Sequence, residues 1–473
     1  MILKTELMPH QKAAFDKVSR HKVGALFMEM GTGKSRVAIE LIHFYRKRGI
    51  KRCLWVCPVN TKHNIASEIS KHSGGLDVHV FDDKPHQKDA DVYIIGTESI
   101  SQSDRAYLEF VELIDDSLVI VDESHDFKTP GSKRTKRLLL NAPKAAARYV
   151  MTGTPMTRGF EDLYCQFHFL SPKILGYGNF NQFAHYHLEF DPVRKGRISR
   201  RKYSNYVTTK IAPYVYQVKK EECLNLPKKT YSFSTFELPG WHGRLYEEVK
   251  NEILDSAEFI QCETGVMIYK LFSTLQRMAC GVKSIDDEYE DLYPNALDNP
   301  RIKDLLWHIN RIPNDEQVIV WAKYTHDINS IRRAIVSTCG EDSVVTLNGE
   351  LTQKERDENI KKFRGGARFL VANPSTGGIG LTLNEASYVI FYSQTFKYVE
   401  RMQAEDRCHR IGQDKNVHYI TIESKTGIDQ MISSVLSRRG NAVEDFKQEV
   451  DAIKKMTDKK QAEKAIKKLR EKL

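Results

Sequence analysis

The sequence has no Cys-x-x-Cys pair, because its eight cysteines are scattered along the chain. This spacing argues against a zinc knuckle and against a disulfide framework, and it predicts reduced thiols. No stretch approaches the roughly 18 consecutive apolar residues that a membrane span needs. The first six residues also lack the basic and then apolar layout of a signal peptide. We therefore expect a soluble, cytoplasmic protein with no membrane partner.

The sequence does have an excess of positive charge, +10 over 473 residues. Such an excess suits a polyanionic partner such as nucleic acid, although many basic proteins bind none. We use the charge only as support for other observations.

Short β-branched apolar runs alternate with longer amphipathic stretches in two series, which is typical of parallel sheets wrapped by helices. The sequence therefore predicts an α/β protein with two lobes. The runs of the first series are Val23–Met28, Cys53–Cys57, Val92–Ile95, Leu118–Val121 and Arg148–Met151, and those of the second are Val318–Trp321, Ser343–Leu347, Phe369–Val371, Tyr388–Tyr392 and Val417–Thr421.

Between about residues 160 and 300 the strand rhythm stops, and the composition becomes aromatic, basic and helical. We predict a first lobe over 1–165, a mainly helical insertion over 166–298, a second lobe over 299–440 and a basic helical tail over 441–473. The tail could bind DNA, dock on the second lobe or recruit a protein partner, and the sequence leaves these three roles open.

A phosphate-binding loop is predicted at Glu29–Ser35, between the strand Val23–Met28 and the helical stretch Arg36–Tyr45. This strand, loop and helix order is the context that such a loop requires. Met28 stands where the full motif has a glycine. An ordinary glycine turn before a helix is the alternative interpretation.

The residue types in this loop suit phosphate chemistry. Gly31 and Gly33 on either side of Thr32 allow a tight turn that points amides at the phosphates, and the helix N-terminus adds partial positive charge. Lys34 would neutralise the β- and γ-phosphates of ATP, and the Ser35 hydroxyl would coordinate Mg²⁺.

Two carboxylates follow the apolar run at Leu118–Val121. The carboxyl ends of sheet strands are where doubly wound folds bind ligands. We expect Asp122 to hold Mg²⁺ and Glu123 to orient and deprotonate the attacking water. Alone, such a pair is weak evidence and is more often a helix cap, but it follows the phosphate loop at a lobe-sized spacing.

Four segments occur in the order that superfamily 2 helicases use, and their details resemble the SWI/SNF-like branch. The resemblance spans roughly residues 5 to 435 and implies two tandem RecA-like lobes. The four segments are Glu29–Ser35, Asp122–His125, Thr152–Pro155 and Gln403–Gln413.

The resemblance implies roles for further residues of the first lobe. Gln11 matches the adenine contact, and Pro58 and Thr97 fall in segments similar to those that grip a strand's phosphates. Thr152 and Thr154 match the stretch that couples the nucleotide site to nucleic acid, and we expect His125 to act in the same relay.

In the second lobe, residues 377–381, which include Gly380, resemble the motif that touches both DNA and ATP, and Gln403 is expected near ATP. Arg407 and Arg410 match the family's arginine fingers. They would share one face if their segment is helical. Their guanidinium groups would then stabilise the γ-phosphoryl charge when the lobes close.

The insertion resembles the helical protrusion of SWI/SNF-like motors, with two departures. An arginine pair is usual near Gln217 and Val218, and asparagine is common where Thr382 stands. The insertion is short and no histone-reading module is visible. We therefore expect a compact motor of a bacterial or phage-infected cell rather than a chromatin remodeller.

A basic stretch precedes three tyrosines, Tyr203, Tyr206 and Tyr214. The cations could track a phosphate backbone while the aromatics stack on exposed bases. Equally, the stretch could be a solvated loop whose tyrosines are core. Its six cations are Arg194, Lys195, Arg197, Arg200, Arg201 and Lys202.

These features predict an ATPase that uses ATP and Mg²⁺, and the resemblance implies that it is DNA-dependent and translocates on duplex or branched DNA; we expect it to act as a monomer. Its expected outputs are branch migration, fork regression or protein displacement in recombination, repair or replication. The alternatives are a strand-unwinding DNA or RNA helicase, and a nucleic-acid binding or annealing protein that uses ATP as a switch.

Overall fold

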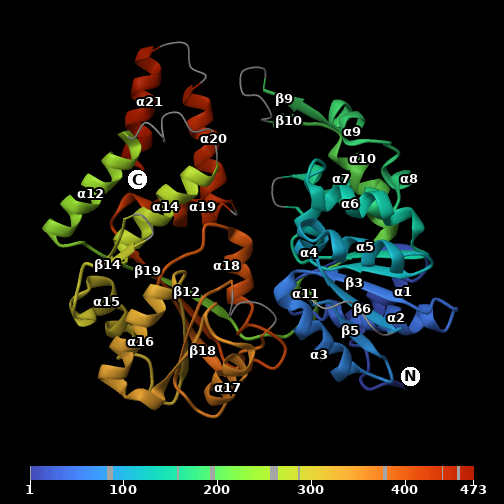
Figure 1. Ribbon diagram of the computed structural model, residues 1–473, viewed down its shortest axis with the longest axis horizontal. Coiled ribbons are helices and arrows are strands. Elements are labelled where there is room, and N and C mark those ends of the chain that lie inside the picture. Colours follow the sequence, from blue (N-terminus) through green and yellow to red (C-terminus); the bar gives the residue numbers. More distant parts are fainter. Residues whose placement is uncertain are drawn as a thin grey trace. The chain divides into compact units, whose positions relative to one another are not determined.

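The computed structural model describes residues 2–82, 89–156, 159–191, 198–255, 265–285, 288–375, 381–438, 440–454 and 459–473. The chain forms two compact units, Met1–Leu226 and Pro227–Leu473. Each unit contains one large sheet flanked by helices (Figure 1).

The first unit is built on a seven-stranded sheet in the order β11-β2-β8-β7-β3-β6-β5, and every neighbouring pair is parallel. The strands are β2 (Val23–Met28), β3 (Cys53–Cys57), β5 (Val78–Val80), β6 (Val92–Gly96), β7 (Leu118–Val121), β8 (Ala147–Met151) and β11 (Val215–Val218).

Alternate residues of each strand pack into two separate hydrophobic cores, because successive side chains point to opposite faces of a sheet. Leu54 and Val56 of β3 belong to one hydrophobic cluster, and Trp55 belongs to the other. One face is covered by α1 (Pro9–Val18), α2 (Lys34–Arg46) and α3 (Lys62–His72). The other is covered by α4 (Thr97–Gln102), α5 (Asp104–Leu113), α6 (Lys133–Asn141) and α7 (Leu163–Leu170).

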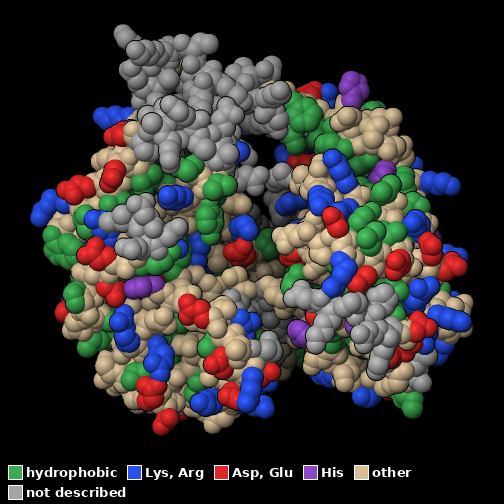
Figure 2. Space-filling model, viewed as in Figure 1, with side chains coloured by type: hydrophobic (Ala, Val, Ile, Leu, Met, Phe, Trp, Pro, Cys, Tyr) green, Lys and Arg blue, Asp and Glu red, His purple; other side chains and the backbone are tan. Residues whose placement is uncertain are grey.

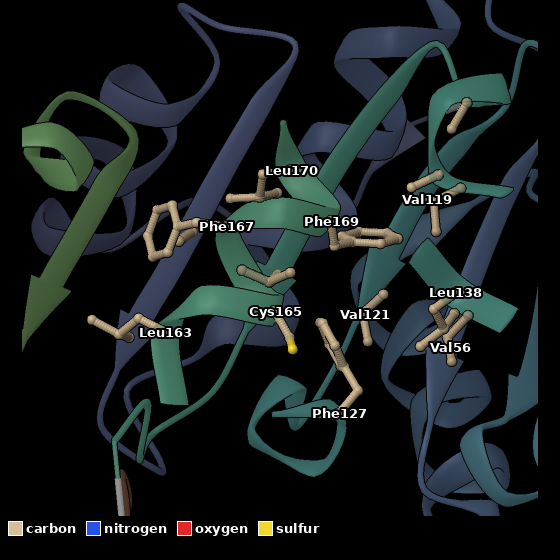
Figure 3. Packing of buried hydrophobic residues seen from close by; sticks show 14 of the residues in the cluster. Val56, Val119, Val121, Phe127, Leu138, Leu163, Cys165, Phe167, Phe169 and Leu170 are labelled. Atoms are coloured by element: carbon tan, nitrogen blue, oxygen red, sulfur yellow. The ribbon is translucent and has the colours of Figure 1, made fainter. Parts of the chain in front are cut away.

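Figure 3 shows at close range the core that contains Leu54 and Val56 and is covered by α4 to α7. There Phe127 and Phe169 lie beside Val119 and Val121 of β7. The two phenyl rings meet edge to face with their centroids 5.8 Å apart. Fully burying one such side chain contributes about 1.5–3 kcal/mol. This packing fixes the strand that carries the predicted acidic pair.

An aromatic extension follows α7 within the first unit. It consists of α8 (Pro172–Leu175), α9 (Phe180–His187), a hairpin of β9 (Leu188–Phe190) and β10 (Ile198–Arg201), and α10 (Ser204–Ile211). Phe183 and Val207 anchor it in the core of the unit.

The second unit is built on a six-stranded sheet in the order β12-β19-β18-β15-β17-β16, again parallel throughout. Its strands are β12 (Lys229–Phe236), β15 (Gln317–Trp321), β16 (Val344–Leu347), β17 (Phe369–Ala372), β18 (Ala386–Phe391) and β19 (Val417–Ser424). Its helices include α15 (Pro300–Ile309), α16 (Thr325–Cys339), α17 (Gln353–Arg364), α18 (Tyr398–Glu405) and α19 (Gly427–Ser437).

A helical bundle stands on this sheet and includes the predicted tail. It joins α12 (Gly240–Asp255) and α14 (Gly265–Ala279) to α20 (Ala442–Lys454) around one hydrophobic cluster, and α21 (Lys459–Glu471) packs against α20. Tyr246 donates a hydrogen bond of 2.6 Å from its hydroxyl to the backbone oxygen of Leu473. The tail therefore docks on the second unit, which is one of the three roles left open by the sequence.

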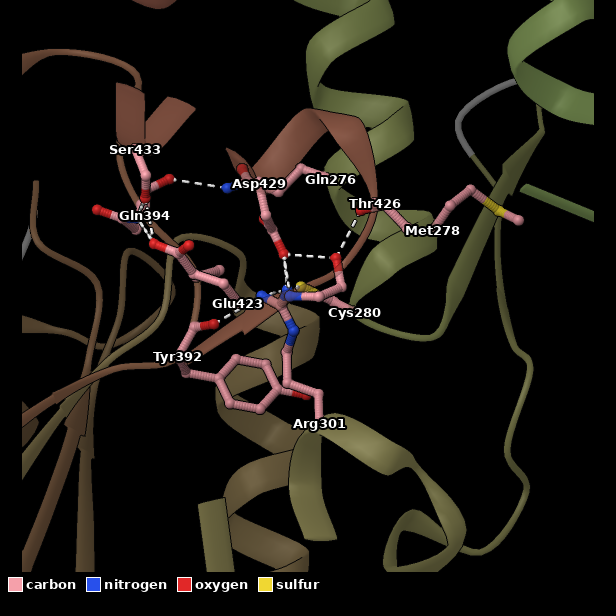
Figure 4. Close-up of polar contacts among 12 residues, drawn as sticks. Gln276, Met278, Cys280, Arg301, Tyr392, Gln394, Glu423, Thr426, Asp429 and Ser433 are labelled. Carbon is pink, nitrogen blue, oxygen red and sulfur yellow. Dashed lines mark hydrogen bonds and ion pairs between the residues drawn. The ribbon is translucent and has the colours of Figure 1, made fainter. Parts of the chain in front are cut away.

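A buried ion pair fastens α15 to α19 in the second unit (Figure 4). Arg301 is fully buried, pairs with Asp429 and donates a hydrogen bond of 2.7 Å to the carbonyl oxygen of Tyr392. Asp429 also accepts hydrogen bonds from the amide and the hydroxyl of Ser424 at 2.8 and 2.7 Å. Both charges are thus compensated, as burial requires.

The predicted α/β class and all ten predicted strands are present, with ends that differ by at most a few residues. The expectation that strands cease between about 160 and 300 is wrong: β11 and β12 are edge strands of the first and second sheets, and β9 with β10 and β13 (Val282–Ile285) with β14 (Glu288–Asp291) form hairpins. Among the described residues, no helix is both long and apolar enough to cross a membrane.

Candidate nucleotide site

Five neighbouring strands of the first sheet present functional candidates at their carboxyl ends. Along the order β2-β8-β7-β3-β6, these ends lead into the phosphate loop and then to Thr152, Asp122, Pro58 and Thr97. Parallel strands place their carboxyl ends on one edge of the sheet, where α/β folds bind ligands. The candidates of the first unit therefore form one row.

The phosphate loop has the backbone that its glycines predict. Gly31 and Gly33 adopt φ values of 80° and 87°, in the left-handed region that favours glycine. Gly33 is also the N-terminal cap of α2, so that Lys34 and Ser35 occupy its first turn. The amides there have no partner within the helix and are available to an anion.

Side chains brace the loop from two directions. The amide of Gln11 donates to the carbonyl oxygen of Thr32 at 3.2 Å, and His10 Nε2 lies 2.8 Å from the same oxygen. The Thr32 hydroxyl donates to the carbonyl oxygen of Glu29 at 2.7 Å, and Lys34 Nζ donates to that of Met28 at 3.0 Å. His10 was not predicted from the sequence, because a single histidine on α1 carries no signal of this contact.

The acidic pair lies at the end of β7. Glu123 has a φ of 46°, an uncommon backbone for a residue other than glycine, and its amide donates to Asp122 Oδ1 at 2.9 Å. The Thr152 hydroxyl donates to Glu123 Oε2 at 3.3 Å. His125 Nδ1 lies 3.0 Å from that hydroxyl and 3.3 Å from Glu123 Oε2.

Thr154 extends the same chain of contacts, since its amide donates to the Thr152 hydroxyl at 3.1 Å. The structure therefore joins Glu123, His125, Thr152 and Thr154 in one hydrogen-bonded relay. The three coupling residues named from the resemblance are in mutual reach, while their coupling role itself stays a prediction.

The two neighbouring carboxyls have opposite pKa shifts. Burial, and next the charge of Glu123, raise the pKa of Asp122 to about 7. Burial acts to raise the pKa of Glu123 too, but hydrogen bonding and charge from His125, the charge of Lys34 and the Thr152 hydroxyl outweigh it and lower that pKa to about 2. Glu123 is therefore held as the carboxylate.

The donor set fits a magnesium ion that a nucleotide brings with it. Ser35 and Asp122 offer hard oxygen ligands, and Mg²⁺ is usually held by one or two carboxylates together with substrate phosphates. A cation beside Asp122 would offset the burial that disfavours its charged form. Within the described ranges, no group of three or more His, Cys, Asp or Glu side chains forms a separate metal cage.

Pro58 and Thr97 follow the adjacent strands β3 and β6. Pro58 caps a short 3₁₀ helix, Val59–Thr61, and the amide of Val59 donates to Glu98 at 3.0 Å. The hydroxyl of Thr97 is buried with no hydrogen-bond partner among the residues that the structure describes. The strand-gripping role of these two residues stays a prediction.

In the second unit, Arg407 and Arg410 follow α18 rather than lying on a helix, so the condition for their sharing a helix face is not met. The helix stops because the backbone turns to bond a nearby loop, where the Leu383 amide donates to the Arg407 carbonyl oxygen at 2.9 Å. Both guanidinium groups still contact the same short segment, at Leu381 and Thr382. Arg407 contacts the Leu381 carbonyl oxygen and Arg410 the Thr382 hydroxyl, each at 3.4 Å.

Other predicted residues of the second unit are only partly described. Gln403 lies half-buried on α18. Residues 377–380, including Gly380, lie outside the described residues.

The basic stretch is less available to phosphates than its sequence predicts. Arg194, Lys195 and Arg197 lie outside the described residues. Arg201 makes a two-pronged contact with Glu161, at 2.8 and 2.6 Å, and Lys202 pairs with Glu189. Arg200 is exposed. The charges of Arg201 and Lys202 are thus largely matched within the unit.

Two protein-family models match this chain. The model of the SNF2-related domain matches residues 12–282, and that of the helicase conserved C-terminal domain matches residues 300–412. The chain therefore belongs to the SNF2-related family, and its two units, each a parallel sheet flanked by helices, confirm the predicted two-lobed α/β architecture.

Among similar proteins is the putative ATP-dependent helicase/translocase YwqA of Bacillus subtilis, 25% identical over 86% of this chain and 45% of its own. Another is the human DNA annealing helicase and endonuclease ZRANB3, 23% identical over 92% of this chain and 40% of its own. The chain spans less than half the length of these relatives. A solved SWI2/SNF2 ATPase core from Sulfolobus solfataricus in complex with dsDNA is 20% identical, covers 98% of this chain and 97% of its own, and has a TM-score of 0.44.

Proposed function

We propose that the protein is a DNA-dependent ATPase that translocates on duplex or branched DNA and remodels it in recombination, repair or replication. The observation that carries the proposal is the row of strand ends, which places the phosphate loop, the acidic pair and the Thr152 relay on one edge of the first sheet. The family and the two relatives named above agree with this activity.

ATP would bind with its phosphates on the amides that open α2. Lys34 would exchange its hydrogen bond to the Met28 carbonyl oxygen for the β- and γ-phosphates, because a phosphate is the stronger partner for an ammonium group. Gln11 would contact the adenine. Ser35 and Asp122 would hold Mg²⁺, whose charge offsets that of the phosphates.

Hydrolysis would use Glu123 as the base that orients and deprotonates water. A carboxylate with a pKa of about 2 is ionised at neutral pH, but it is a weak base. The positioning of water and the charge stabilisation of the phosphoryl group therefore carry most of the rate. Arg407 and Arg410 would supply that stabilisation as arginine fingers, while Gly380 and Gln403 complete the nucleotide contacts.

The relay would couple hydrolysis to DNA. His125, Thr152 and Thr154 are linked to Glu123 by hydrogen bonds, so a change at the γ-phosphate would alter contacts along the row toward Pro58 and Thr97, which would hold strand phosphates. We propose further that the protein acts as a monomer in the cytoplasm.

The test is ATP hydrolysis by the wild type and Lys34→Ala with no nucleic acid, single-stranded DNA, duplex DNA, a four-way junction and RNA. We expect stimulation of at least about tenfold by duplex or junction DNA, and its loss in Lys34→Ala. The control is Lys303→Ala, which changes a lysine that is 61% exposed in the second unit and leaves the rate unchanged.

Other outcomes would redirect the proposal. Stimulation by single strands or RNA alone would favour an unwinding helicase. Full biological activity of a Glu123→Gln variant would favour a protein that uses ATP only as a switch.

A further inference from the structure

Three tyrosine rings of the aromatic extension are exposed on one surface. Tyr186 lies in the last turn of α9, Tyr203 is the N-terminal cap of α10, and Tyr206 lies in its first turn. Their exposed fractions are 50%, 59% and 38%. The Tyr186 ring centroid lies 5.1 Å from that of Tyr203 and 6.4 Å from that of Tyr206. We call Tyr186, Tyr203 and Tyr206 the tyrosine platform.

The platform rests on a fixed base. Below it lies His187, which is fully buried, with Nε2 2.9 Å from the Tyr177 hydroxyl and Nδ1 3.0 Å from the carbonyl oxygen of Lys202. The His187 ring lies 5.8 Å from Tyr206 and 6.3 Å from Tyr203. Because both nitrogens of His187 are engaged, the rings above it have a rigid support.

One platform residue has an uncommon backbone. Tyr203 has a φ of 54°, and outside glycine few residues adopt this left-handed conformation. The surrounding contacts hold it there, since the Lys202 amide on one side donates to the His187 carbonyl oxygen at 2.7 Å. Such backbone conformations cluster where a side chain is positioned for a ligand.

The charge around the platform is mainly positive, and the nearby Glu189 is paired with Lys202. Residues 171–188 and 198–214 contain no aspartate or glutamate. Arg200 and Lys210 are exposed there, and Lys210 Nζ lies 5.5 Å from the centre of the Tyr206 ring. In Figure 2, hydrophobic side chains and a histidine reach the surface where Figure 1 shows α9 and α10.

Aromatic rings among cations are the means by which proteins bind single strands, because every base has a stacking face and every nucleotide a phosphate. We infer that the tyrosine platform binds unpaired bases of DNA, such as those at a fork or junction, with Arg200 and Lys210 near the adjoining phosphates. This inference rests on the proposed action on DNA and names the part of the substrate that this surface recognises. It gives the protein a single-strand contact outside the row of strand ends.

The test measures binding by the full chain, without ATP, of a labelled oligothymidine, a blunt duplex and a fork with unpaired arms. In the double variant Tyr186→Ala with Tyr203→Ala, we expect affinity for the oligothymidine and the fork to fall about tenfold or more. Affinity for the blunt duplex should stay within about twofold, because no unpaired base is present. Tyr186→Phe with Tyr203→Phe keeps the rings and should bind as the wild type does.

Two further measurements keep the result interpretable. Tyr289→Ala removes a tyrosine that is 49% exposed in the second unit and should change nothing. If the double variant is unstable, the single Tyr186→Ala variant replaces it, and a 2-aminopurine base in the fork arm should be quenched by the wild type and less by the variant.

The inference is overturned if the alanine variants bind the oligothymidine and the fork as the wild type does, or if they lose duplex binding to the same extent. Preference of the wild type for oligouridine over oligothymidine would also overturn it, since the surface would then select RNA. The proposed function fails separately, when no DNA stimulates ATP hydrolysis, because the binding test needs no hydrolysis.

Discussion

At the scale of single residues, Gly33 has two reasons to be glycine. Its φ is 87°, and a Cβ built on it would lie 2.2 Å from Gln11 Nε2. The left-handed backbone alone costs a residue with a Cβ about 1–2 kcal/mol. Relief of the contact would require Gln11 to move, and its hydrogen bond to the Thr32 carbonyl oxygen would then be lost.

We therefore expect Gly33→Ala to weaken the binding of a fluorescent ATP analogue by at least about tenfold. The control is Gly49→Ala, because Gly49 has a φ of 93° and nothing within 4 Å of its added Cβ. This control has the same backbone strain but lies away from the phosphate loop. If both variants lost the same affinity for the ATP analogue, the cause would be general instability, and our account of Gly33 would be contradicted.

At the scale of elements, the contact between α15 and α19 depends on compensated charge. In the variant Asp429→Asn, the Arg301 guanidinium would remain fully buried without its counter-ion, and breaking such a pair costs about 3–5 kcal/mol. Replacing both partners, as in Arg301→Met with Asp429→Leu, should cost clearly less, because no charge is stranded.

Urea unfolding followed by circular dichroism measures this difference. The control is Glu237→Gln, which removes an exposed ion pair with Lys425 and should leave the unfolding midpoint unchanged. A double variant that is as unstable as Asp429→Asn would show that shape, and not charge compensation, holds the two helices together.

The elements that the sequence predicted well are the buried ones. Runs such as Leu118–Val121 are apolar throughout, because both faces of their sheet are covered. The edge strands β11 and β12 were missed, since Tyr216-Gln217 and the alternation of Lys229–Phe236 carry polar residues that only an edge position allows. The loop chemistry at Gly31 and Gly33 could be predicted, whereas the non-helical turn at Arg407 depends on its contact with the Leu383 amide.

At the scale of the whole molecule, the chain leaves the first unit through one edge strand and enters the second through another. Because β11 completes the first sheet beside β2, and β12 completes the second beside β19, the division falls between Leu226 and Pro227. Every described strand of each large sheet then has its partners within one fragment.

We expect fragments 1–226 and 227–473 to fold separately, each with a cooperative thermal transition by circular dichroism. A fragment 1–165 is the matched comparison. It lacks β11 and most of α7, so it would expose β2 and part of the core, and should melt at a clearly lower temperature. Fragments 1–226 and 1–165 of equal stability would count against this view of the edge strand.

The row of strand ends also limits how a change at the nucleotide site could reach the predicted DNA contacts of the first lobe. Hydrogen-bonded strands keep a spacing of about 4.8 Å, so the four intervals from β2 to β6 set about 19 Å between the phosphate loop and Thr97. A change of nucleotide therefore cannot alter the distance between the phosphate loop and Thr97 by much. Any signal that travels along the sheet edge must pass as rearranged hydrogen bonds among side chains such as Thr152 and His125, and the sheet itself serves as the fixed frame against which those side chains act.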